Sequence, residues 1–212
     1  MFNLVESDLR GRILGCGDGP ASFNAEMSAH GRGVVSVDPL YAFPAAAIER
    51  RVEETYDIII EQVTRNRDDF VWTHVPSIPA LGRRRMGAMR RFLADFAQGK
   101  REGRYVDASL PDLPFDDSAF DLALCSHFLF LYSEQFDLAF HLGALQEMLR
   151  VAGEVRVFPL LQIGGAPSPH VQAVMDAFTA QGVRATIESV PYEFQRGGRR
   201  MMRLRKASGT RA

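Results

Sequence analysis

Glycine alternates with a cysteine and an aspartate in the segment ILGCGDGP, residues 13–20. Glycine has no Cβ atom and tolerates positive φ, so a backbone this rich in glycine can turn sharply and approach another group closely. Three occupants fit such a turn: a nucleotide-like cofactor, a phosphate, or another part of the protein. An apolar run precedes the turn and a helical pattern follows it, which predicts a strand-to-helix connection.

Polar side chains follow three further apolar runs of the chain. Asp38 follows GVVSV, residues 33–37, Asp107 follows RYV, residues 104–106, and Ser126 and His127 end FDLALCS and begin the next loop. In open α/β sheets, ligands bind at the carboxyl ends of the strands. A carboxylate at position 38 can accept hydrogen bonds from both hydroxyls of a ribose, and Asp107 can meet an adenine amino group.

The elements that must hold these residues alternate along the chain. We expect parallel strands at 12–14, 33–37, 104–106, 120–126 and 154–161, and helices at 20–30, 134–151 and 171–182. The segments ATIESV, 185–190, and MMRLRK, 201–206, predict two final strands joined by a turn at 196–199. The prediction is an α/β fold with a seven-stranded, mostly parallel sheet, an antiparallel last strand and helices on both faces.

About sixty residues separate the second expected strand from the third, far more than one crossover needs. Residues 45–66 and 83–99 each have apolar residues at helical spacing, and the connection between them holds Trp72 and His74. We therefore expect a helical insertion at about 44–103 that caps the sheet within a single domain spanning 1–212.

The segments LGCGDG, SVDP and VDASLPDLPFDDSAFDLALCSH together resemble the class I S-adenosylmethionine-dependent methyltransferases, over roughly residues 9–43 and 103–206. The resemblance implies a Rossmann-like fold and S-adenosylmethionine as cofactor. It implies that the cofactor is bound by Gly15, Cys16 and Gly17 at its methionyl part, Asp38 at its ribose, Pro39 or Leu40 against its adenine, Asp107 with the Ala108 N–H at the adenine edge, and Ser126 near the sulfonium. One departure is Ile13, since the family has an acid two positions before the first glycine.

Methyl transfer from a sulfonium is an in-line displacement with an activated leaving group. The protein has to align donor and acceptor, and it needs a base only where the acceptor loses a proton. The candidate proton acceptors are His127, Tyr132 and His74, in that order. A histidine at the end of an apolar strand also fits a hydrogen-bonded wall residue, and this alternative stays open.

The acceptor is less clearly indicated than the cofactor. Methyltransferases that act on exocyclic amines of nucleic-acid bases resemble one another in an Asn/Asp-Pro-Pro-aromatic motif, whereas the matching position here reads SHFL, 126–129. Cys125 lacks the neighbouring proline typical of cytosine C5 methylation. We therefore expect a small-molecule acceptor and no nucleic-acid partner. The alternatives are an RNA-directed methyltransferase and a non-catalytic cofactor-binding or interaction protein on the same fold.

Composition sets broader limits. The chain has 212 residues, of which 46% are hydrophobic and 24% charged, and its two cysteines make neither a disulfide framework nor a zinc cluster. No apolar stretch reaches the roughly 18 residues that span a bilayer, and the first residues do not resemble a secretory signal. We expect a cytoplasmic protein with no membrane partner and no metal site. The sequence leaves the oligomeric state open.

Positive charge is concentrated in two segments. Residues 83–104 hold eight basic and two acidic side chains, and the segment from Arg196 onward holds seven basic residues and no acid. Such a distribution can guide an anionic ligand to one face, and it also fits a solvated helix face followed by a frayed tail.

Overall fold

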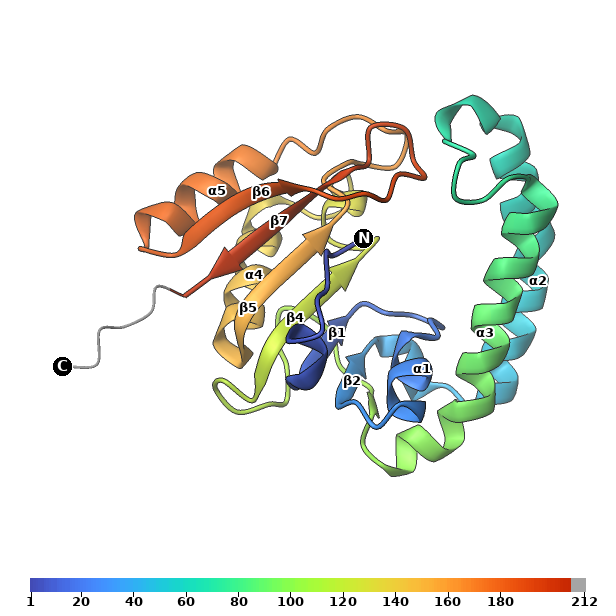
Figure 1. Ribbon diagram of the computed structural model, residues 1–212, viewed down its shortest axis with the longest axis horizontal. Coiled ribbons are helices and arrows are strands. Elements are labelled where there is room, and N and C mark those ends of the chain that lie inside the picture. The colour runs from blue at the N-terminus through green and yellow to red at the C-terminus, as the bar shows by residue number, and fades with distance from the viewer. Residues whose placement is uncertain (207–212) are drawn as a thin grey trace.

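The computed structural model describes residues 1–206, and Arg211 of the basic C-terminal segment lies outside them. One seven-stranded sheet has the order β3-β2-β1-β4-β5-β7-β6 (Figure 1). The strands are β1 (Ile13–Cys16), β2 (Val34–Val37), β3 (Tyr105–Val106), β4 (Phe120–Ser126), β5 (Ala152–Phe158), β6 (Arg184–Ser189) and β7 (Arg200–Arg205). The first five pair in parallel, and β7 is antiparallel to both β5 and β6. This confirms the predicted sheet.

Helices cover both faces of the sheet, as the buried strands require. On one face, α4 (Leu138–Val151) and α5 (Val171–Ala180) pack on side chains such as Leu14 and Ala123. On the other face, α1 (Phe23–Ala29) and the N-terminal segment pack on side chains such as Ile13 and Leu122. Consecutive strand residues therefore enter opposite clusters, which is the two-residue period of a strand.

Several element boundaries differ from the sequence prediction, and three of them have a clear local cause. Helix α1 begins at Phe23 instead of Pro20, because residues 17–22 continue the glycine turn. Strand β5 ends at Phe158, since Pro159 has no N–H to extend the ladder. Helix α4 begins at Leu138, where the Asp137 side chain accepts a hydrogen bond from the N–H of Phe140.

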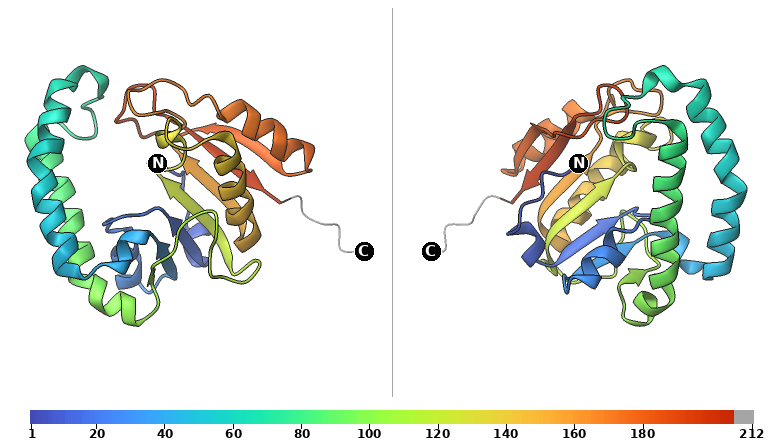
Figure 2. Two further views of the ribbon diagram at one scale, coloured as in Figure 1. Left: turned by 180° about the vertical axis from the view of Figure 1, so that it is seen from behind. Right: turned by 45° about the vertical axis from the view of Figure 1, so that its right-hand side comes forward.

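The predicted insertion is a hairpin of two long helices, α2 (Ala45–Arg65) and α3 (Ile78–Arg101). We call residues 45–101 the arch, because they rise beside the sheet and curve past the ends of the strands (Figures 1 and 2). One cluster anchors the base of the arch to the sheet; its buried members are Tyr41, Ile48, Val52, Phe92, Phe96 and Tyr105. Along residues 1–206, none of the helices is both long enough and apolar enough to cross a membrane.

The tip of the arch returns to the sheet at the loop between β6 and β7. The N–H of Val71 donates to the carbonyl of Phe194 at 2.7 Å, and Phe70 pairs with Gln195 in an isolated antiparallel bridge. The Phe70 and Phe194 rings stack with centroids 4.9 Å apart, and the Trp72 ring meets the Phe194 ring edge-on. We call this contact, residues 68–74 with 191–196, the latch.

Candidate functional site

The carboxyl ends of four adjacent strands bring the predicted site residues to one edge of the sheet. Cys16 is in register with Val37 of β2 and with Cys125 of β4, and Val37 is in register with Val106 of β3. Gly17, Asp38, Asp107 and Ser126 are each the last residue of one of these strands or the next residue along the chain. The strand order thus brings together segments that lie far apart in the sequence.

The protein's own side chains cover two of the three glycines in the turn. A Cβ atom on Gly15 would lie 1.9 Å from Oδ2 of Asp18, and one on Gly17 would lie 2.9 Å from the ring of Phe128. Gly17 and Gly19 have φ of +66° and +56°, a region that side chains rarely adopt. A Cβ atom on Gly19 would meet nothing within 4 Å. The open part of the turn is therefore at Gly19, which the sequence analysis did not single out.

Asp38 holds the glycine turn against the end of β2. Its Oδ2 accepts a hydrogen bond from the N–H of Gly19 at 2.8 Å, and its Oδ1 accepts one from the N–H of Leu40 at 2.8 Å. The hydroxyl of Tyr41 donates to the carbonyl of Gly19 at 2.9 Å. Each carboxylate oxygen has a second lone pair, so Asp38 can hold the turn and still accept a further hydrogen bond.

Asp18 is a carboxylate at this edge that the sequence analysis missed. The hydroxyl of Ser36 donates to its Oδ2 at 2.6 Å. Burial raises the pKa of Asp18 to about 6, although the hydrogen bond from Ser36 acts in the opposite direction. The sequence did contain a signal for Asp18. The family's usual acid is replaced by Ile13, and Asp18 is an acid within the same glycine turn.

The remaining residues predicted to bind the cofactor differ in how far their side chains are exposed to solvent. The Cys16 and Cys125 side chains are fully buried in the core, and burial raises the pKa of both thiols. Only the backbone of Cys16 can therefore face the edge. Pro39 and Asp107 are exposed, while Leu40, Ala108 and Ser126 are partly buried.

His127 follows β4 with φ of +54°, in the left-handed region that costs a non-glycine residue energy. Its N–H donates to the carbonyl of Phe158 at 2.7 Å, and its Nδ1 is 2.9 Å from Oγ of Ser126. The ring is accessible to solvent, yet protein surrounds it beneath the arch. This burial, with the nearby charge of Arg85, lowers the pKa of His127 to about 4.

The other two candidate bases have different surroundings. Tyr132 is 37% exposed, and its ring lies 6.1 Å from the ring of Phe128. His74 belongs to the latch, where its ring stacks on Tyr192 and its Nε2 is 3.2 Å from the carbonyl of Pro191. Of the three, His127 lies at the end of a strand beside the glycine turn.

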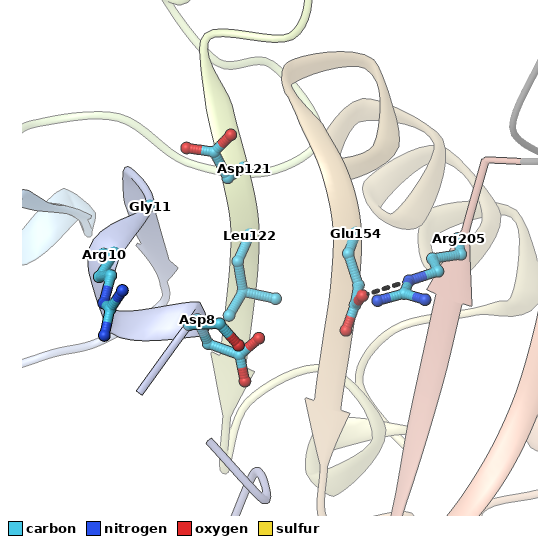
Figure 3. A pocket seen from close by; sticks show the side chains of 8 residues that line it. Asp8, Arg10, Gly11, Asp121, Leu122, Glu154 and Arg205 are labelled. Atoms are coloured by element: carbon cyan, nitrogen blue, oxygen red, sulfur yellow. Dashed lines mark hydrogen bonds and ion pairs between the residues drawn. The ribbon is translucent and has the colours of Figure 1, made fainter. Parts of the chain in front are cut away.

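A cavity of about 460 Å³ lies at the opposite, amino edge of the sheet (Figure 3). Its lining includes Asp8, Arg10, Asp121, Glu154 and Arg205. The carboxylate of Glu154 pairs with Arg205 at 2.5 Å, and the carboxylate of Asp121 accepts a hydrogen bond from the N–H of Arg12. These charged groups are already engaged in holding strands together.

No family model matches this sequence. An uncharacterized protein of Methanocaldococcus jannaschii is 28% identical over 207 residues, which are 97% of this chain and 90% of that protein. Among solved structures, an O-methyltransferase family protein of Burkholderia thailandensis superposes with a TM-score of 0.52 at 13% identity, covering 97% of this chain and 54% of that one. The PH0226 protein of Pyrococcus horikoshii superposes with a TM-score of 0.50 at 12% identity, covering 93% and 82%.

Proposed function

We propose that this chain, whose fold is the Rossmann-like fold of the class I methyltransferases, binds S-adenosylmethionine at the carboxyl edge of its sheet and methylates a small molecule. The observation that carries the proposal is the convergence of the glycine turn, Asp38, Asp107 and Ser126 at adjacent strand ends of that fold. In this proposal residues 1–212 act as one domain, and the arch covers the site.

The described residues fit this cofactor. Open space at Gly19 leaves the turn accessible, and Asp38 retains lone pairs for the ribose hydroxyls. Asp107 and the Ala108 N–H follow β3 at the same edge, where they would meet the adenine. Asp18 lies over Gly15, so its carboxylate would accept hydrogen bonds from the methionyl ammonium in place of the acid missing at Ile13.

When bound, S-adenosylmethionine supplies a methyl group on a positively charged sulfur. The task of this chain is to orient the acceptor and, where the acceptor must lose a proton, to remove that proton. The lowered pKa keeps His127 neutral at pH 7. Its Nδ1 lies against Ser126, which fixes the ring and leaves Nε2 to accept the proton. Tyr132 is the second candidate for this role.

Three of the eight positive side chains at residues 83–104 are engaged within the protein. Arg104 pairs with Asp95, Arg91 pairs with Glu26, and the ammonium of Lys100 donates to the carbonyl of Tyr41. Phosphate binding at these three side chains would have to compete with the contacts. A small-molecule enzyme should not retain RNA at moderate salt, whereas an RNA-directed enzyme would show RNA binding that weakens steeply with salt.

Calorimetric titration with S-adenosylmethionine and S-adenosylhomocysteine tests the proposal, with NADH as the ligand control. We expect the two sulfur ligands to bind, Asp107→Ala and Asp38→Ala to weaken both, and Asp57→Ala on the exposed face of α2 to bind as the parent protein does. Asp107→Ala is included because Asp38 also holds the glycine turn. A folded protein that binds neither sulfur ligand would overturn the proposal.

Turnover separates an enzyme from a non-catalytic binding protein. Once an acceptor is found by screening, His127→Gln should lower kcat and leave the affinity for S-adenosylhomocysteine nearly unchanged. Loss of that affinity in His127→Gln would instead make His127 a wall residue of the cofactor site. Binding without turnover on any acceptor would favour the non-catalytic alternative.

A further inference from the structure

Strand β6 (Arg184–Ser189) lies at one end of the sheet, with β7 on one side and no strand of residues 1–206 on the other (Figure 1). It pairs with β7 along its whole length, and the next N–H, that of Val190, donates to the carbonyl of Arg199 at 2.9 Å. Hydrogen bonds alternate along an antiparallel pair. The even-numbered residues of β6 therefore bond to β7, and the odd-numbered residues point their N–H and C=O groups outward.

Two residues offer free backbone groups at this outer edge. The outward N–H and C=O groups of Ala185 and Ile187 have no hydrogen-bond partner in the part of the chain that the structure describes. The carbonyl of Ser189, in contrast, accepts a hydrogen bond from the side chain of Asn3 at 2.9 Å. The Ile187 side chain is also 37% exposed. Unpaired groups along the edge of a sheet are a template on which another strand can pair.

The side chains of β6 are complementary to a second copy of the same strand. Arg184 and Glu188 lie two residues before and two residues after Thr186, so all three side chains share one face of the sheet. In an antiparallel pair of β6 strands centred on Thr186, Arg184 of each strand faces Glu188 of the other. The same pairing brings Ile187 against Ala185. Opposite charges and apolar side chains that face each other directly stabilise a strand pair.

The backbone restricts where the centre of such a pair can lie. Outward N–H and C=O groups must meet one another, so an antiparallel copy can be centred on Ala185, Thr186 or Ile187. A centre at Ala185 would place Arg184 opposite Thr186, and a centre at Ile187 would place Glu188 there. In either case the other charge would lie beyond the end of the partner strand. The centre at Thr186 pairs both charges, and it lets Ala185 and Ile187 exchange both hydrogen bonds with the partner.

The charged side chains have capacity left for this contact. Arg184 is exposed, and its guanidinium has no ion-pair or hydrogen-bond partner among residues 1–206. Glu188 uses its Oε1 for Arg203 and for the hydroxyl of Thr186, each at 3.3 Å, which leaves its Oε2 for another donor. A proline, a bulge or a run of like charge would block a copy of the strand. Strand β6 has none of these.

We propose that the outer edge of β6 is an interface between two copies of this chain, whose β6 strands pair antiparallel about a two-fold axis at Thr186 and join the two sheets. Such an interface is isologous, so each contact between Arg184 and Glu188 occurs twice. A strand pair alone is smaller than the surface that a permanent dimer buries, and the association is therefore reversible and depends on protein concentration. It is independent of the proposed cofactor site, because β5 and β7 lie between β6 and the strands that form that site.

A cysteine at the two-fold axis tests the pairing directly. In the proposed dimer Thr186 faces its own copy in a non-hydrogen-bonded pair, where Cα atoms are about 4.5 Å apart and a disulfide can form. Under mild oxidation, Thr186→Cys should therefore run as a disulfide-linked dimer on a non-reducing gel. The native cysteines, Cys16 and Cys125, are both buried and should form no such link.

Ile187→Cys is the matched control for this register. Residue 187 faces residue 185 of the partner, so the two introduced thiols would be two residues out of register and beyond the roughly 7 Å between Cα atoms that a disulfide spans. We expect this variant to remain monomeric under the same oxidation. No dimer in Thr186→Cys, or equal cross-linking of the two variants, would overturn the proposal.

Charge reversal tests the side-chain contacts without any cross-link. Sedimentation velocity at roughly 10 to 500 μM protein should show the parent in equilibrium between monomer and dimer. Arg184→Glu and Glu188→Arg should each weaken self-association by about tenfold or more, because two repulsive pairs replace two attractive ones. An equimolar mixture of the two variants should associate as the parent does, since every glutamate then faces an arginine.

Arg50→Glu on the exposed side of α2 is the control for a change in net charge, and it should associate as the parent does. A parent that stays monomeric over the whole concentration range would overturn the proposal. Undiminished association of Arg184→Glu alone, or a mixture that associates no better than the separate variants, would do the same.

Discussion

The carboxylate of Asp18 occupies the space beside the Cα atom of Gly15, with Oδ2 only 1.9 Å from where a Cβ atom would be. The same oxygen accepts a hydrogen bond from Ser36 on the neighbouring strand. Glycine at position 15 is thus required by a partly buried acid of the protein itself. Side chains of the protein therefore fill the space beside Gly15 and Gly17. The space beside Gly19 is open and could take a ligand.

Substituting Gly15 by alanine should expel the Asp18 carboxylate from its place. Overpacking of this kind costs about 2 kcal/mol of unfolding free energy, measured by urea denaturation. Gly33→Ala is the matched control, because a Cβ atom on Gly33 would meet nothing within 4 Å. Equal stabilities of the two variants would show that Asp18 can move aside at no cost.

Asp18→Asn should change how stability depends on pH. The pKa of Asp18 is about 6 in the folded protein and 3.8 for the ordinary side chain, so the folded state holds the proton more tightly. Its contribution to stability is therefore fully present below about pH 4 and lost as the pH rises through 6. We expect Asp18→Asn to be more stable than the parent at pH 8, and the difference to close below pH 4.

Urea denaturation at several pH values measures this effect. Glu53→Gln on the exposed side of α2 is the control, and it should show no such pH-dependent gap. If Asp18→Asn is less stable than the parent at pH 8, the folded protein stabilises the ionised form of Asp18, and the prediction is wrong.

The NMR titration of His127 should have its midpoint near pH 4, because burial and Arg85 disfavour the imidazolium. Arg85→Gln should move the midpoint upward, since a positive neighbour is removed. The His127→Gln variant, which lacks this signal, identifies it in the spectrum. A midpoint near the ordinary value of 6.5 would show that the space beneath the arch is as wet as bulk solvent.

Glu154→Gln should destabilise the sheet by about 3 kcal/mol, because three arginines would lose the carboxylate that they share. Glu154 pairs with Arg156 at 2.6 Å, Arg203 at 2.7 Å and Arg205 at 2.5 Å. Burial acts to raise the pKa of Glu154, but these ion pairs lower it below its ordinary value. The stabilisation is therefore present above about pH 4.5 and is lost as the pH falls.

A surface pair supplies the comparison for that variant. Glu61 pairs with Arg65 on the exposed side of α2. Glu61→Gln should cost no more than about 0.5 kcal/mol, as exposed pairs do. Similar losses in the two variants, measured by thermal unfolding at pH 7, would show that burial adds nothing to the Glu154 cluster.

Phe194→Ala should weaken the latch, since the stacked pair with Phe70 contributes about 1 kcal/mol. Trp72 is the only tryptophan of the chain, and its ring lies 5.6 Å from that of Phe194. Its fluorescence should therefore shift to the red in the variant. Phe43→Ala, at a side chain that is 56% exposed, should leave the spectrum unchanged.

The sheet could be predicted from the sequence because each buried strand is a short apolar run and the final pair is marked by a Gly-Gly turn. The strand ends of β2, β3 and β4 followed from the same runs, and with them the positions of Asp38, Asp107 and Ser126, whereas β1 ends two residues later than predicted. Parallel pairing alone brings these residues to one edge, so no side-chain detail was needed.

The contacts across the arch could not be predicted, because they join residues far apart in sequence without any local pattern. The latch pairs residues 68–74 with 191–196, and Phe128 covers Gly17 from the loop that follows β4. Arg85 belongs to a basic run. Its nearness to His127 could be recognised only once α3 is placed beside the strand ends. Asp18 was hidden for a similar reason, because a turn residue normally points to solvent.

The carboxyl edge consists of four segments between residues 15 and 128, and β1 lies between β2 and β4 in the sheet. Pairing β1 with β4 closes a chain segment of about a hundred residues, which is slow because of its loop entropy. During synthesis, the proposed cofactor site cannot form until residue 128 has left the ribosome and the arch no longer separates the strands that must pair. A ligand of this edge would then act as a late folding partner that traps the finished sheet and gives the nascent chain no help before that point.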